Sequence, residues 1–190
     1  MTGRPYERAG LTKCRPTLPT GESNLSSVAW KHSKPFDANT TPGEMILHPD
    51  FKEFVALLNA HDVRFLVVGG YAVAFHGHPR YTKDIDLWVE AEPENAARLM
   101  AALQEFGFGS VGLKAEDFLE PDQIVQLGYP PSRIDLITTL KGVEFGACYE
   151  ARVTVEIEGV DVPFIDLEHL KQNKRSTGRN QDRADLEQLE

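Results

Sequence analysis

The stretch RFLVVGGYAVAFHGHPRYTKDIDLWVE, residues 64–90, decides the fold. Its first part, Arg64–Val68, is an apolar run of the length of a buried strand, and it ends at Gly69-Gly70. The next segment, Tyr71–His76, is predicted to be a helix that the following glycine and proline terminate. Charged and apolar residues alternate in Lys83–Val89, which is typical of a strand with one solvated face. The stretch therefore predicts a strand, a glycine turn, a helix and a second strand.

The glycine turn is suited to binding phosphate. Glycine lets the backbone adopt a positive φ and approach a ligand closely. The start of the helix adds free N–H groups and the positive end of a dipole. Gly69 and Gly70 are therefore candidate phosphate-binding residues, although a tight strand-to-helix turn explains them equally well when they are considered alone.

Two aspartates share one face of the second predicted strand. Asp84 and Asp86 are two positions apart, so their side chains point the same way, separated by roughly 6 to 7 Å along the backbone. Neighbouring carboxylates repel each other unless a cation lies between them, and oxygen-only ligands suit Mg²⁺ or Mn²⁺. The alternative for this pair alone is a solvated strand face.

A third aspartate, Asp135, lies inside another apolar strand, Arg133–Ile137. A carboxylate in such a strand is costly unless it is paired or bound to metal. If the two strands are neighbours, Asp135 joins Asp84 and Asp86 on one face, and three carboxylates suffice for two divalent ions. A sheet-edge position in water or an ion pair with Arg133 is the alternative.

The remaining elements follow from periodicity and end signals. The first predicted helix opens with a capping box of Asp50 and Glu53, and its inward face carries Phe54, Leu57 and Leu58. The second runs from Pro93 to Gly107, and its inward face carries Ala97, Met100, Ala101 and Leu103. After them we predict a strand at Ile124–Leu127, a hairpin of Ala151–Ile157 and Val160–Ile165, a helix from Asp166 through Lys174 to Gly178, and a last helix capped by Asn180. Strands and helices intermix without regular alternation, which favours an α+β fold with a mixed β-sheet flanked by helices.

Composition narrows the class of protein. The 190 residues are 41% hydrophobic and 26% charged, which is ordinary for a soluble globular chain. No apolar run has the length of a membrane span or the form of a secretory signal, and Cys14 and Cys148 match neither a disulfide framework nor a zinc site, so we expect a cytoplasmic protein. The net charge of -9 argues against broad binding to duplex DNA.

Residues 1–44 differ from the rest. They contain five prolines among many Ser, Thr, Gly and Arg residues, and neither a helical nor a strand period runs through them. Disorder of this N-terminal extension is therefore predicted.

The ordered set of motifs resembles a known superfamily. Val68-Gly69-Gly70, then Asp84-Ile85-Asp86-Leu87, then Asp135 in a later strand resemble nucleotidyltransferases with the DNA polymerase β-type fold. Within that superfamily, Arg80–Asp86 resembles the Arg-x-Thr-x-Asp-x-Asp block of small bacterial proteins related to the AbiEii toxin and the minimal nucleotidyltransferases. Their C-terminal basic and acidic stretch is similar to residues 174–185, although Gln181 replaces the usual Lys. The resemblance implies that residues 45–190 form a nucleotidyltransferase-like domain.

This resemblance also implies a mechanism. The turn of Gly69 and Gly70 holds the triphosphate of an NTP. Asp84 and Asp86 bind the Mg²⁺ or Mn²⁺ that bridges the phosphates, and with Asp135 they bind a second ion that activates an acceptor hydroxyl. The hydroxyl oxygen attacks the α-phosphorus, pyrophosphate leaves, and Asp135 is a candidate general base.

Other candidate residues have weaker patterns. Thr82 precedes the metal-binding strand and is predicted to support it. Lys174, with the arginines near it, is a candidate phosphate ligand. The alternative for Lys174 is a solvated basic helix end. His76 and His78 lack a third ligand, which favours a surface role. Core or rim packing is predicted for Cys148, Trp88 and Tyr71.

Several functional classes are excluded or remain open. The glycines are followed by neither a Walker Lys-Ser/Thr nor the later glycine of a dinucleotide fingerprint. The acceptor remains open among a protein hydroxyl, a tRNA 3′ end and a small molecule. A non-catalytic nucleotide- or partner-binding module, or a toxin–antitoxin component with a small protein partner, is the alternative to an active enzyme.

A regular pattern begins directly after Met45, so we expect Met45 to be the true start of the protein or residues 1–44 to be dispensable. Mass spectrometry of the native protein gives the N-terminal residue directly. An intact tail whose removal abolishes activity would contradict this prediction.

Overall fold

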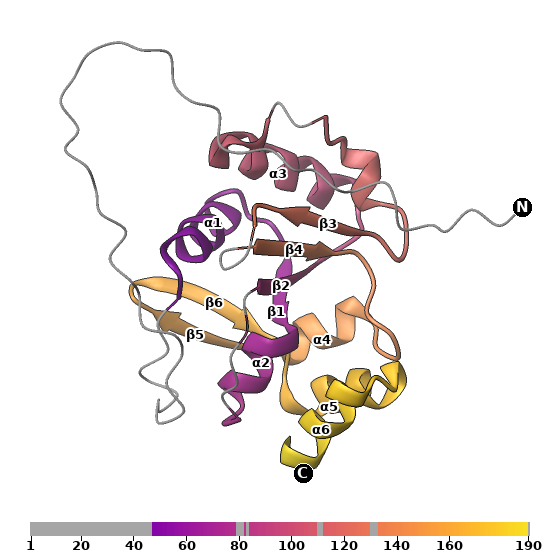
Figure 1. Cartoon of the computed structure of the whole chain (residues 1–190). Coiled ribbons are helices and arrows are strands. Elements are labelled where there is room, and N and C mark those ends of the chain that lie inside the picture. The colour runs from indigo at the N-terminus through magenta and orange to yellow at the C-terminus, as the bar shows by residue number, and fades with distance from the viewer. Residues whose placement is uncertain (1–46, 79–81, 83, 110–111, 130–132, 190) are drawn as a thin grey trace, which may run out of the picture.

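A computed structural model describes residues 47–78, 82, 84–109, 112–129 and 133–189 (Figure 1). The predicted disorder of residues 1–44 lies outside these residues, as do Arg80 and Lys83 of the motif block. Among the described helices, none combines the length and the apolar character that crossing a membrane requires.

The core element is a six-stranded mixed sheet with the order β3-β4-β2-β1-β6-β5. Its central strands β1, β2 and β4 confirm the strands predicted around the glycine turn and the three aspartates. β2 pairs antiparallel with β1 and parallel with β4, while the outer pairs β3–β4 and β5–β6 are antiparallel. The strands are β1 Phe65–Val68, β2 Asp84–Val89, β3 Ile124–Leu127, β4 Arg133–Ile137, β5 Val153–Ile157 and β6 Val160–Phe164.

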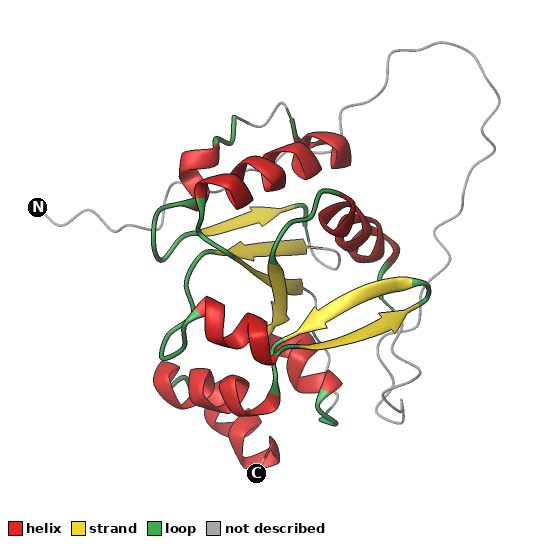
Figure 2. Cartoon of the chain, turned by 180° about the vertical axis from the view of Figure 1, so that it is seen from behind, coloured by secondary structure: helices red, strands yellow, loops and turns green. Residues whose placement is uncertain are grey.

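Helices lie on both sides of the sheet, as the α+β prediction requires. α1 and α3 contact each other and lie together on one side, whereas α4, α5 and α6 gather on the other (Figures 1 and 2). The helices are α1 Pro49–Ala60, α2 Gly69–Phe75, α3 Pro93–Leu103, α4 Phe145–Ala151, α5 Leu167–Thr177 and α6 Asn180–Leu189, with a π-helical turn η2 at Gln104–Phe108 and a 3₁₀ turn η3 at Ala115–Phe118.

The two faces of the sheet differ in chemistry because side chains alternate along each strand. One face of the β2–β4 pair carries Ile85, Leu87, Ile134 and Leu136, all at most 2% exposed. The opposite face carries the aspartates. The apolar face belongs to the core, which leaves the polar face of the same two strands for chemistry.

Three details correct the predictions from sequence. His48 caps α1, because its Nδ1 accepts the N–H of Asp50; the predicted capping box of Asp50 and Glu53 is wrong. α4 was not predicted, and its last residue, Ala151, was assigned to the hairpin. α2 begins at Gly69 rather than Tyr71.

The inward face of α3 was predicted correctly for Leu103 and for the partly buried Met100, but wrongly for Ala97 and Ala101. Its buried residues are Asn95, Ala96, Leu99, Ala102 and Leu103, whereas Ala97 and Ala101 are exposed. The cause is Asn95, a polar residue that is fully buried. Its Oδ1 accepts the N–H of Arg64 at 2.7 Å, and its Nδ2 donates to the carbonyls of Arg64 and Glu90, both at 3.0 Å. These bonds tie α3 to the ends of β1 and β2.

We expect Asn95→Ala to lower the free energy of unfolding by about 2 kcal/mol, because it leaves buried backbone groups without partners. Urea denaturation measures the change. The exposed neighbour Glu94 supplies the matched control Glu94→Ala, for which we expect less than about 0.5 kcal/mol. Equal, small effects of both substitutions would contradict a structural role for Asn95.

Candidate active site

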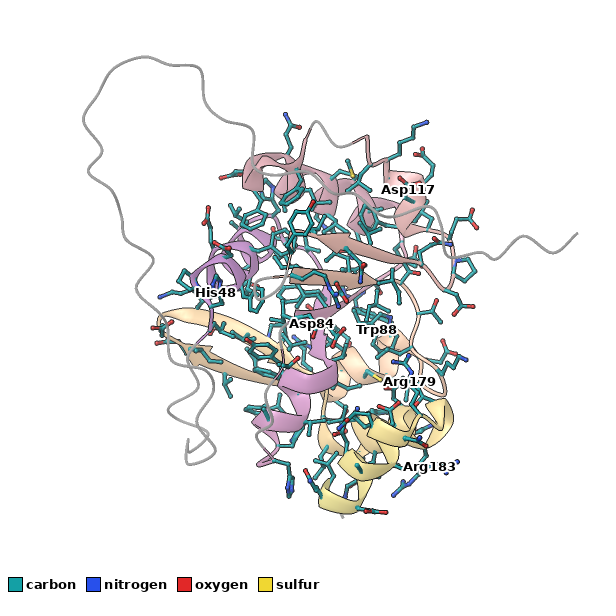
Figure 3. The ribbon with its side chains drawn as sticks, in the orientation of Figure 1. His48, Asp84, Trp88, Asp117, Arg179 and Arg183 are labelled. Carbon is teal, nitrogen blue, oxygen red and sulfur yellow. The ribbon has the colours of Figure 1, made fainter. Side chains whose placement is uncertain are left out.

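The three aspartates meet on one face of the sheet. β2 and β4 are parallel neighbours whose register places Asp84 beside Arg133 and Asp86 beside Asp135. The predicted adjacency of the two strands is therefore confirmed. Figure 3 shows Asp84 near the centre of the molecule, on the same strand as Trp88.

Arg133 joins two of the carboxylates. Its Nε donates to Oδ1 of Asp135 at 2.7 Å and its Nη2 to Oδ2 of the same residue at 2.9 Å. The same Nη2 also donates to Asp84. The hydrogen bond and charge of Asp135, with the charges of Asp84 and Asp86, raise the pKa of Arg133. The ion pair that the sequence left as an alternative for Asp135 is thus present, and it includes Asp84 as well.

Neutral side chains complete the contacts of the outer two carboxylates. Thr82 donates its hydroxyl to Oδ1 of Asp84 at 2.9 Å, so it supports the strand as predicted from its position. Gln126 of β3 donates to Oδ2 of Asp135 at 3.3 Å. The sequence did not predict the contribution of Gln126. The only sign of it was a polar residue in the otherwise apolar strand Ile124–Leu127.

Asp86 has a different environment. Burial, followed by the charges of Asp84 and Asp135, raises its pKa from 3.8 to about 7. The N–H of Gly70 and the charge of Lys174 oppose this shift without cancelling it. The ionised form of Asp86 is therefore poorly compensated by the protein itself.

Gly69 lies in close contact with the carboxylate of Asp86. Its φ is +61°, and a Cβ at this position would lie 2.0 Å from Oδ2 of Asp86. Both the backbone angle and the lack of space therefore require glycine. The glycine turn lies directly against Asp86, which places its backbone next to the acidic group; a role in binding phosphate stays a prediction.

Lys174 lies in a buried ionic cluster with two residues of α6. Its Nζ is 2.8 Å from Oδ1 of Asp182 and 2.7 Å from Oδ2 of Asp185. Burial alone would raise the pKa of Asp182. The hydrogen bonds from Lys174 and Thr177 act in the opposite direction, and the net result is a pKa below its ordinary value. Lys174 is 4% exposed, and the alternative of a solvated helix end is therefore wrong for this residue. Gln181, at the position where the resemblance fails, donates to Asp185 at 3.1 Å.

The remaining candidates have structural contacts. Nε2 of His76 lies 2.9 Å from the carbonyl of Ile165, which holds α2 against the end of β6. Cys148 is fully buried, and burial raises the pKa of its thiol to about 11, as expected of a packing residue. Trp88 and Tyr71 are buried in the core.

The donor set at the aspartates consists of oxygens alone, which fits Mg²⁺ or Mn²⁺. The poorly compensated charge of Asp86 fits a cation equally well. In the described part of the chain, no three His, Cys, Asp or Glu side chains are spaced to hold a metal ion. Arg133 instead holds Asp84 and Asp135.

A cavity of about 520 Å³ lies at the other end of the same two strands. Trp88, Glu90, Thr138 and Phe145 are among its lining residues, and none of the three aspartates is. It is therefore separate from the acidic group, although Trp88 points from the same face of β2 as Asp84 and Asp86.

Residues 48–190 match the model of a protein family described as nucleotidyltransferase of unknown function (DUF6036). The chain belongs to this family. The resemblance to nucleotidyltransferases that the motifs predicted is confirmed at this level.

One solved structure shows the same fold, and a second is similar in part. A crystal structure of a candidate nucleotidyltransferase from Thermotoga maritima aligns with a TM-score of 0.51 and 17% identity over 75% of this chain and 94% of that one. An antigenic nucleotidyltransferase-like protein from Paracoccidioides brasiliensis aligns with a TM-score of 0.45 and 20% identity over 75% and 77% of the two chains. No curated protein matches the chain.

The pKa of Asp86 predicts how stability depends on pH. Since the folded pKa of about 7 lies above the ordinary 3.8, the folded chain holds this proton more tightly than the unfolded chain. Stability is therefore lost as pH rises from about 4 to 7. We expect Asp86→Asn, without metal, to raise the free energy of unfolding by about 2 kcal/mol at pH 8 and by almost nothing at pH 4.

Urea denaturation at both pH values measures this difference. The exposed Asp122 supplies the control Asp122→Asn, whose effect should not depend on pH in this way. A gain for Asp86→Asn that is the same at pH 4 and pH 8 would show that burial does not raise this pKa.

Proposed function

We propose that the protein transfers a nucleoside monophosphate from an NTP to a hydroxyl acceptor with the help of Mg²⁺ or Mn²⁺. The observation that carries the proposal is the β2–β4 register, which sets Asp135 beside Asp86, the carboxylate that lies against the glycine turn. Membership of the family supports the same general reaction.

Each side chain has a proposed task. Asp84, Asp86 and Asp135 would hold the divalent ion. When bound, the ion supplies positive charge to the phosphate oxygens that become more negative during transfer. Asp135 is the proposed general base for the acceptor hydroxyl. It is 6% exposed and is fixed by Gln126 and Arg133, so its carboxylate is held in one orientation.

The backbone and a buried cation complete the site. Gly69 and Gly70 would bring N–H groups close to the triphosphate, since they already lie against Asp86. Lys174 is proposed to supply positive charge to the phosphates. Its charge lowers the pKa of Asp86, although less than the other causes act on it, and this effect supports the proposal.

The finer classification is also a proposal. The blocks at Arg80–Asp86 and residues 174–185 support a polymerase β-type enzyme related to the AbiEii toxin. On this basis we propose a cytoplasmic toxin–antitoxin component that acts with a small protein partner. The acceptor would then be a protein hydroxyl, a tRNA 3′ end or a small molecule.

One observation favours the second candidate, a nucleotide- or partner-binding module without turnover. Arg133 neutralises part of the charge of Asp84 and Asp135 without any metal. A chain that had lost catalysis could keep its fold in this way. The intact set of three aspartates supports the enzyme instead.

Incubation with each labelled NTP, Mg²⁺ or Mn²⁺, and cell extract tests the two candidates. We expect label to appear on protein, RNA or a small molecule, and Asp84→Asn or Asp86→Asn to reduce it at least about 100-fold, because charge stabilisation in the transition state is lost. Asp122→Asn is the control and should label as the unaltered protein does. No labelling, together with partner binding that survives both substitutions, would identify a binding module.

A further inference from the structure

Arg133 makes three hydrogen bonds across two of the three carboxylates. We propose that its guanidinium is a built-in cation that takes the place of a second divalent ion between Asp84 and Asp135, so that the protein binds one divalent ion at this site. The inference rests on the proposed function, because it concerns the metal that this function uses, and it changes the expectation of two ions.

The position of Arg133 is fixed by the sheet. The register sets it directly beside Asp84 on the neighbouring strand. Strand periodicity places it on the same face as Asp135, two residues further along β4. The guanidinium can therefore reach both carboxylates without leaving its own strand. A planar guanidinium also matches a carboxylate with two parallel bonds, as it does here on Asp135.

The balance of charge favours one ion. Three carboxylates and one guanidinium have a formal charge of two negative units, which a single divalent ion balances. A second such ion would leave an excess of positive charge in a partly buried group. Arginine cannot relieve this excess by losing its proton, because the guanidinium stays protonated in proteins.

The same contacts indicate where the single ion binds. The oxygens of Asp84 and Asp135 already accept bonds from Thr82, Gln126 and Arg133. Asp86 receives the N–H of Gly70 and lies under Gly69. It is therefore the carboxylate most in need of a cation, and the ion is expected beside it.

Binding of Mn²⁺ alone tests the inference without relying on activity. Electron paramagnetic resonance of free Mn²⁺ during titration of the full chain, without nucleotide, gives the number of bound ions and their Kd. We expect one bound ion for the unaltered protein. For Arg133→Gln we expect a second ion, or a first ion bound at least about tenfold more tightly, because a fixed positive charge at contact distance is removed.

Two variants guard against a misleading result. Arg183→Gln removes an exposed arginine of α6 (Figure 3) and should bind Mn²⁺ as the unaltered protein does. Arg133→Met keeps an unbranched side chain without charge and replaces Arg133→Gln if that variant does not fold. Circular dichroism establishes which variant is folded before the titration.

The outcomes are distinct. Two ions on the unaltered protein, or identical stoichiometry and Kd after neutralisation of Arg133, overturn the inference. An unaltered protein that binds no ion also overturns it, because the inference requires one divalent ion at this site. Extra Mn²⁺ binding by Arg133→Gln, with no labelling from any NTP by the unaltered protein, leaves the inference standing while the proposed function fails.

Discussion

The site depends on a single electrostatic constraint: three carboxylates stand on one face of two adjacent strands, where they repel each other and are partly removed from water. The three carboxylates are not compensated equally. Asp84 and Asp135 share the guanidinium of Arg133, whereas Asp86 receives the N–H of Gly70 and the charge of Lys174. The uncompensated negative charge is therefore concentrated on Asp86, the residue that the glycine turn contacts.

The fold explains why the repulsion between the carboxylates is tolerated. The opposite face of the same strands is fully apolar and packs into the core, so the strands are held in register regardless of the charges. α3 is fixed to the far ends of β1 and β2 through Asn95. Packing of the apolar face and the hydrogen bonds of Asn95 therefore stabilise these strands, which allows a costly arrangement of carboxylates on the opposite face.

Local patterns predicted the strands of the site well, because alternation along β2 and β4 determines which side chains share a face. They could not establish that β2 and β4 are neighbours, since that depends on a crossover through α3 and β3. The sequence suggested an ion pair of Arg133 with Asp135, but its reach to Asp84 required the register. α4 was missed because Gly146 interrupts a short segment without clear period. Two of the four residues predicted to face inward on α3, Ala97 and Ala101, were misassigned because the buried polar Asn95 breaks the apolar pattern.

The cluster of Lys174 with Asp182 and Asp185 has a consequence for the order of assembly. The carboxylate strands precede α5 and α6 in the chain, so during synthesis they emerge from the ribosome first. The lysine is fixed only when α6 arrives with its two acidic residues. A nascent chain therefore lacks the charge of Lys174 beside Asp86 in its final position until these last turns have docked.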